Sequence, residues 1–97
     1  KICGGGAKSP LWKKMIANIL NIKVDVIESE EGPALGGAML AAVANGEFAS
    51  VEDAAAKIVK VIDTVEPEPE LAAKYEEKYR KFAKIYPTVK DLFSEII

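Results

Sequence analysis

The stretch that decides the fold reads GGGAKSPLW over residues 4–12. Successive glycines let a backbone approach a ligand closely and adopt positive φ angles. Ser9 and Pro10 predict that a helix begins here, with serine as the N-cap and proline in the first helical position. The free N–H groups of a first helical turn attract anions, so the stretch suits a phosphate or a nucleotide's sugar. Neither G-x-x-x-x-G-K-[ST] nor G-x-G-x-x-G fits, and a plain strand-to-helix turn remains open as the alternative.

In the rest of the chain, the spacing of apolar residues and the positions of capping residues, glycines and prolines predict helices and two short strands. The expected helices are 10–20, 32–45, 51–59 and 69–85, and the expected strands are 22–27, with Ile22, Val24 and Val26 on one face, and 61–65. Ser50 and Asp53 read as a capping box, and Gly46 suits a left-handed helix end. Pro87 is expected to interrupt the long helix, and Thr88 with Asp91 to cap a last helical stretch toward Ile97.

Composition bounds the function. The chain has 97 residues, a net charge of −2 and no histidine, with 49% hydrophobic and 29% charged residues. This balance argues against disorder and against a nucleic-acid binder, which needs an excess of basic residues. Without histidine and with Cys3 alone, an internal disulfide and a Ser-His-Asp triad are excluded, and a zinc site is not expected. No run of about 18 apolar residues predicts a membrane span. A lone cysteine fits a reducing compartment, and we expect a cytoplasmic protein.

The predicted fold class is α/β, or α+β when the chain is taken alone, with helix dominant. One or two short strands do not make a stable domain. The chain also opens on its glycines without a methionine or a lead-in element. We therefore expect a C-terminal piece of a longer protein, with the missing strands upstream. Residues 1–50 are rich in glycine and small apolar side chains, whereas 51–97 hold a short helix, a strand and the charged, aromatic C-terminal helices.

Three further features are candidates for function. Gly36 and Gly37 each cost a helix about 1 kcal/mol relative to alanine, which close packing or a ligand would offset; packing is the commoner reason for Gly37. An aromatic stripe at helical spacing predicts a core or partner-facing surface rather than a ligand box. It comprises Leu71, Tyr75, Tyr79, Phe82, Ile85, Tyr86 and Val89. Charged residues near the glycines, Lys13, Lys14, Glu28, Glu30 and Glu31, could hold phosphate or a metal but are more often solvated.

The set of motifs resembles the C-terminal domain of the FGGY carbohydrate kinases, nearest the xylulokinase branch. The resemblance is carried by GGGAKSPLW, by Ala17 and Val24, by EEGPALG at 30–36 with Ala38 and Ala41-Ala42, and by Glu66-Pro67, Tyr75, Tyr79 and Tyr86-Pro87. It implies an actin-like fold of two ribonuclease-H-like domains with ATP between them, this chain being the last part of the second. It also implies phosphoryl transfer from MgATP to a sugar hydroxyl, D-xylulose in that branch.

The resemblance further implies which residues of this chain bind ATP and which functions belong to other segments. The expected ATP-binding residues are Gly4, Gly5, Gly6 and Ala7, then Ser9 and Trp12, with Gly36 packing near the same cleft. Lys14 stands where the family commonly has glutamine, and Asn18 where it commonly has aspartate. The resemblance therefore does not determine which polar side chains contact adenine. The catalytic base and the magnesium-linked acids belong to upstream segments; no catalytic or metal-binding residue is expected here, and the chain alone should be inactive.

Two other interpretations remain open from the residues. The chain could be a stand-alone interaction or dimerisation module, with a structural glycine turn and a self-associating apolar face. It could also belong to a kinase for another sugar or polyol, or to a different actin-like ATPase. The residues do not name the sugar, because sugar contacts are expected mainly upstream.

Overall fold

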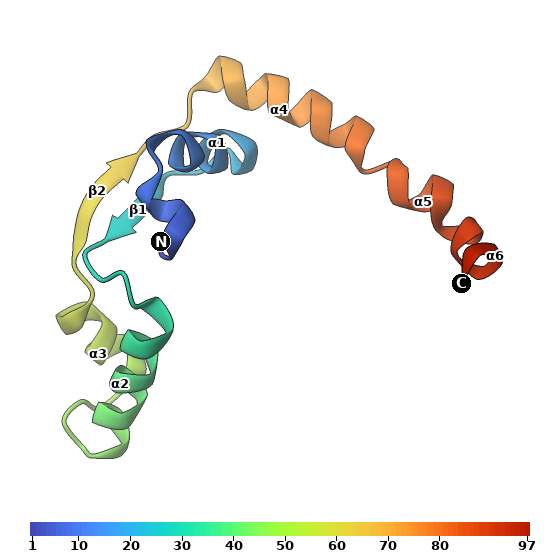
Figure 1. Ribbon diagram of the computed structural model, residues 1–97. Helices are drawn as coiled ribbons and strands as arrows, with labels where there is room; N and C mark the ends of the chain where they lie inside the picture. Colours follow the sequence, from blue (N-terminus) through green and yellow to red (C-terminus); the bar gives the residue numbers. More distant parts are fainter.

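A computed structural model describes all 97 residues and shows an open arrangement of helices around a small sheet (Figure 1). In chain order the elements are η1 (Gly5–Lys8), α1 (Pro10–Leu20), β1 (Val24–Ile27), α2 (Gly32–Ala44), α3 (Val51–Ile58), β2 (Val61–Val65), α4 (Pro69–Phe82), α5 (Ile85–Val89), η2 (Lys90–Leu92) and α6 (Phe93–Ile96). Helix therefore dominates, as the sequence predicts. No helix combines the length and the apolar character needed to cross a membrane.

The sheet pairs β1 with β2 in antiparallel register, with Val24 opposite Val65 and an irregularity after Val26. Ile2 adds a single parallel bridge to Val26, and its N–H donates to the Asp25 carbonyl at 2.8 Å. Val24 and Val26 are buried on one face, as their alternation predicts. The bridge at Ile2 brings the glycine segment to the edge of the sheet.

Local sequence signals set most helix ends. Ser9 Oγ accepts the Trp12 N–H at 3.3 Å, which confirms the predicted N-cap of α1. Gly46, just past α2, has a φ of 83°. Ser50 Oγ accepts the Asp53 N–H at 3.1 Å, so α3 also has its predicted cap. The reciprocal bond from the Asp53 carboxylate, which would complete a capping box, is not made.

Two predicted boundaries were wrong. The first strand begins at Val24 rather than Ile22, because Asn21 ends α1 in the left-handed conformation and leaves Ile22 half exposed in the turn. The long helix ends at Phe82, and Pro87 lies inside the next helix instead of breaking the chain itself. Proline has no N–H for the carbonyl four residues earlier and crowds it, so its effect falls on Ala83, a turn upstream.

The predicted cap of the last helical stretch was also wrong. Thr88 Oγ1 donates back to the Lys84 carbonyl at 2.7 Å and caps no helix. The chain instead continues through η2 into α6 without a side-chain cap at either start. A threonine hydroxyl that bonds to the carbonyl four residues earlier is compatible with continued helix, and the residues after Thr88 remain helical.

Very little of the chain is buried. The seven buried residues are Ala7, Ala17, Asn18, Val24, Val26, Ala54 and Ala72, and no large side chain is fully enclosed. The radius of gyration is 18.8 Å, whereas about 13 Å is expected of a compact domain of 100 residues. Figure 1 shows why: α4, α5 and α6 extend in one direction from the sheet, and α2 and α3 in another. The small sheet and α1 form the only layered region.

The glycine-rich face of α2 is not packed within this chain. A Cβ added at Gly36 or Gly37 would meet no atom within 4 Å. α2 contacts α3, but none of its residues is buried. The close packing expected at Gly37 is therefore not made within the chain, and the glycine surface is open.

Candidate nucleotide-binding site

The glycine segment forms a short 3₁₀ helix rather than a simple turn. Gly4 precedes η1 with φ 89° and ψ −178°, a conformation available essentially to glycine alone. The Ala7 N–H donates to the Gly4 carbonyl at 3.1 Å, and the Ala7 side chain is buried. The glycines therefore act by backbone shape, with Ala7 anchoring the segment.

The first three backbone amides of this segment have no hydrogen-bond partner. The N–H groups of Gly4, Gly5 and Gly6 make no hydrogen bond. A Cβ at Gly4 or Gly5 would meet nothing within 4 Å. Consecutive free amides in an unobstructed segment suit the oxygens of a phosphate or a ribose. The residues present thus fit part of a nucleotide.

Trp12 and Ser9 lie at the junction of η1 and α1. A Cβ at Gly6 would come within 3.1 Å of Trp12 Cε3, so the indole packs directly over Gly6. The ring remains 59% exposed and shares an apolar surface with Met15, Ile16 and Ile19. Ser9 Oγ already accepts the Trp12 N–H as the N-cap of α1. Its O–H remains able to donate.

A shallow hollow separates the glycine segment from the loop after β1. Its volume of about 190 Å³ lies below the roughly 300–1,000 Å³ of small-molecule sites. The lining residues are Ile2, Cys3, Gly4, Ala7, Lys8, Lys13, Val26, Ile27, Glu28, Ser29, Glu30 and Ile62. The hollow is too small to enclose a whole nucleotide, and it can form only part of such a site.

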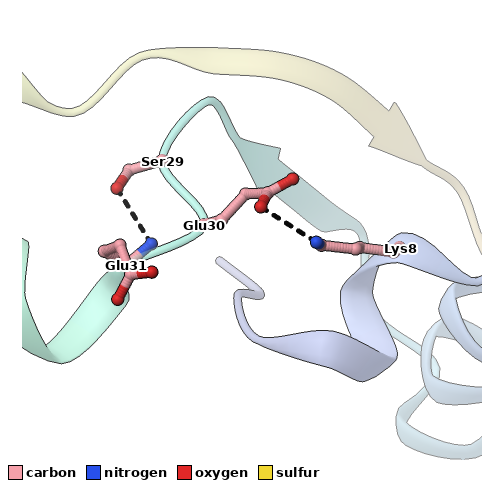
Figure 2. Close-up of polar contacts among 4 residues, drawn as sticks. All are labelled: Lys8, Ser29, Glu30 and Glu31. Atoms are coloured by element: carbon pink, nitrogen blue, oxygen red, sulfur yellow. Dashed lines mark hydrogen bonds and ion pairs between the residues drawn. The ribbon is translucent and has the colours of Figure 1, made fainter.

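One ion pair crosses the hollow. Lys8 Nζ donates to Glu30 Oε2 at 2.9 Å, linking the end of η1 to the loop between β1 and α2 (Figure 2). In the same loop, Ser29 Oγ accepts the Glu31 N–H at 3.2 Å. A second contact joins the same two segments, because Gly32 lies so close to Cys3 that a Cβ there would overlap the cysteine Sγ. The start of α2 is thus held beside the glycine segment.

The remaining charged candidates are used structurally. Lys13 is mostly buried, with its side chain 16% exposed, and its Nζ lies 3.7 Å from Asp63 Oδ2 on β2. Glu28 pairs with Lys60 at 3.8 Å. No three acidic, cysteine or histidine side chains gather closely enough to hold a metal ion. The loop acids therefore offer no magnesium site of their own.

Asn18, one of the two departures from the family pattern, makes a contact between helices. It is buried, and its Oδ1 accepts the Glu68 N–H at 2.7 Å at the start of α4. This bond gives the first turn of α4 a partner from α1. Lys14, the other departure from the family pattern, is exposed and makes no ion pair.

The structure brings some of the predicted site residues together. Gly4 and Ala7 line the hollow, and Gly5, Gly6, Ser9 and Trp12 adjoin it along η1 and α1. Gly36 lies a turn along α2 and does not line it. The Lys8–Glu30 pair went unpredicted, although opposite charges flanking two glycine-containing helix starts were visible in the sequence.

Comparison with known proteins assigns the family. Residues 1–45 match the model of the "FGGY family of carbohydrate kinases, C-terminal domain". The xylulose kinase of Staphylococcus epidermidis strain RP62A is 36% identical over 94 residues, covering 97% of this chain and 19% of that protein. The xylulose kinase of Bacillus subtilis strain 168 is 39% identical over 89 residues, covering 92% and 18%. The chain belongs to the FGGY family of carbohydrate kinases.

The fold agrees with this assignment. Ligand-bound xylulose kinase from Lactobacillus acidophilus superposes with a TM-score of 0.83 at 20% identity, covering 98% of this chain and 19% of that one. This likeness confirms the predicted fold class, a helix-dominant C-terminal part of an actin-like fold. The FGGY chain described here spans about a fifth of the length of the relatives it matches.

Proposed function

We propose that this chain supplies the adenosine-side wall of the ATP site in a sugar kinase. Gly4, Gly5, Gly6 and Ala7 would line the nucleotide with backbone, and Ser9 and Trp12 would border it. The observation that carries the proposal is the row of amides at Gly4–Gly6 that have no hydrogen-bond partner, in a segment that is unobstructed around Gly4 and Gly5 and that matches the family. We propose that Gly36, which has no side chain, lets other segments of the cleft approach α2 closely.

In the full-length protein the reaction would be phosphoryl transfer from ATP to a sugar hydroxyl, with D-xylulose as the first candidate sugar. Magnesium, when bound with ATP, would neutralise phosphate charge and stabilise the charge that develops during transfer. The residues of this chain would orient the nucleotide and hold its oxygens. The acid–base chemistry and the metal ligands would come from other segments. The lone free cysteine, Cys3, fits a reducing compartment, and we propose that the protein is cytoplasmic.

The chain alone is expected to be inactive and to bind ATP weakly. Its hollow is smaller than a nucleotide site, and η1 is exposed on most of its surface. A site that lacks its opposite wall cannot desolvate the phosphates or fix the sugar hydroxyl in line with them.

The test is sugar-dependent ADP release by the full-length protein. Purified enzyme, MgATP and one sugar at a time are assayed, with D-xylulose compared with other ketopentoses and with polyols. The proposal predicts ADP release that depends on one sugar and on ATP, and a phosphorylated sugar detected by mass spectrometry. ADP release with no sugar dependence, or none at all, would contradict it. If a polyol were the best substrate, the protein would be assigned as a polyol kinase of the same family.

One observation favours a second role, self-association through apolar surface. Tyr79, Phe82 and Tyr86 are 58%, 67% and 64% exposed along α4 and α5. Exposed apolar patches of this kind commonly bind a protein surface. Light scattering of the isolated chain over a concentration series distinguishes a defined dimer from a monomer or from open-ended aggregation.

A further inference from the structure

Lys8 and Glu30 are 22 positions apart, and their ion pair connects the glycine segment to the loop before α2. Lys8 is the last residue of η1, and Glu30 lies two residues before Gly32, where α2 begins. The Nζ–Oε2 distance of 2.9 Å is that of a charge-assisted hydrogen bond (Figure 2). Both side chains line the hollow. The pair therefore spans the hollow beside the proposed nucleotide-binding amides.

The pair adds little to the stability of the fold. The Lys8 and Glu30 side chains are 61% and 68% exposed, and water screens ion pairs at that exposure. Its consequence is geometric. It fixes the separation of two backbone segments that also meet where Cys3 contacts Gly32.

The loop around Glu30 is itself held in place. Ser29 Oγ accepts the Glu31 N–H at 3.2 Å, which fixes the backbone on both sides of Glu30. At the other end, Lys8 directly precedes Ser9, whose hydroxyl caps α1. Each side chain thus extends from a short segment with a defined backbone. The bond between them therefore restrains the position of one segment relative to the other.

We propose that Lys8 and Glu30 are positioning residues of the nucleotide site. Their bond holds the free amides of the glycine segment at a fixed distance from α2, and Lys8 acts through Glu30 rather than as a ligand of phosphate. The inference rests on the proposed function. It differs from the simpler expectation, that a lysine beside a glycine-rich segment binds phosphate directly, in what it predicts for Glu30.

The experiment measures KM for ATP and KM for the sugar in the full-length enzyme. The variants are Lys8→Met, Glu30→Gln and the exchanged pair Lys8→Glu with Glu30→Lys. The matched controls are Lys81→Met and Glu77→Gln, which break a pair of similar length and exposure, 2.8 Å with 74% and 71%, on α4. We expect each single variant to raise KM for ATP about three- to fivefold, the range that breaking an exposed pair allows. KM for the sugar and the melting temperature should stay unchanged, and the exchanged pair should restore KM for ATP.

Two results would overturn the inference while leaving the proposed function intact. If Glu30→Gln leaves KM for ATP unchanged or lowers it while Lys8→Met raises it, Lys8 binds the nucleotide directly. If neither single variant differs from the controls, or if the exchanged pair fails to restore KM, the bond does not position the site. An unmodified enzyme that neither binds nor uses ATP would refute the proposed function, and the positioning role with it.

Discussion

Asn18 shows how one buried polar side chain connects two helices. It is 3% exposed, and its Oδ1 accepts the Glu68 N–H at 2.7 Å, so α1 supplies the cap that α4 lacks in its own sequence. Glu68 occupies the N-cap position of α4, yet its side chain makes no capping bond. The junction buries Ala17 and Ala72 beside this bond. A small, well-satisfied contact thereby fixes where α4 leaves the sheet region.

Replacing Asn18 tests this junction. Asn18→Ala removes the acceptor of a part-buried hydrogen bond, which contributes about 0.5–1.5 kcal/mol. The first turn of α4 should therefore exchange its amide hydrogens up to roughly ten times faster. Asn18→Asp keeps the acceptor and should preserve protection. Hydrogen–deuterium exchange of the full-length protein, followed in the peptide containing Glu68, measures both. Unchanged exchange in Asn18→Ala would show that the bond is dispensable.

Gly4 and Gly5 allow a matched test of backbone strain. Gly4→Ala forces alanine into a conformation that costs about 1–3 kcal/mol, although its Cβ would meet no atom. Gly5 has no positive φ and equal space around it, so Gly5→Ala should be tolerated in the absence of nucleotide. Exchange of the Ala7 amide, which donates to the Gly4 carbonyl, should accelerate in Gly4→Ala alone. Equal behaviour of the two variants would argue against a strained Gly4.

At the scale of elements, the start of α2 depends on the space that Gly32 leaves for Cys3. A Cβ at Gly32 would overlap the Cys3 Sγ, and the Cys3 Cβ would lie 3.3 Å away. Gly32→Ala should displace Cys3 and speed its labelling by a thiol reagent, read in the peptide that carries it. Cys3→Gly removes both clashing atoms. In the double variant, exchange at the start of α2 should return to the unmodified rate; a failure to do so would place the strain elsewhere.

The helices and strands were largely predictable because their end signals are local. Ser9-Pro10, Ser50 and Gly46 act within one turn of themselves, and the structure places helix ends beside each of them. The effect of Pro87 was misplaced because proline disturbs the turn before it. Contacts between distant segments, such as Lys8 with Glu30 or Asn18 with Glu68, depend on the tertiary fold. Neither pair has a periodic signal, so only the structure could connect them.

At the scale of the whole molecule, the chain exposes more apolar surface than a self-sufficient domain would. Seven of 97 residues are buried, and the radius of gyration of 18.8 Å is far above the compact value of about 13 Å. The resemblance to FGGY kinases predicted this architecture better than composition did, because composition describes an ordinary globular chain. The apolar faces of α1, α4 and α5 remain available to other segments.

In the isolated chain, the region formed by α1 and the sheet should therefore be only marginally stable, and the chain should bind ATP weakly. We expect no saturable ATP binding at micromolar concentrations by calorimetry, no phosphorylation of D-xylulose, and a scattering radius at or above that of the structure. Micromolar ATP binding by the isolated chain would show that its own residues complete the site. The full-length enzyme serves as the positive control.

The central claim is that residues 4–9 form the nucleotide side of a kinase cleft, and hydrogen–deuterium exchange of the full-length protein tests it most directly. Exchange is compared with and without a non-hydrolysable ATP analogue and magnesium. The account predicts slower exchange across Gly4–Ser9, whose first three amides are free without ligand, and no change in the distal half of α4. Saturating analogue that protects other segments and leaves Gly4–Ser9 unchanged would contradict it.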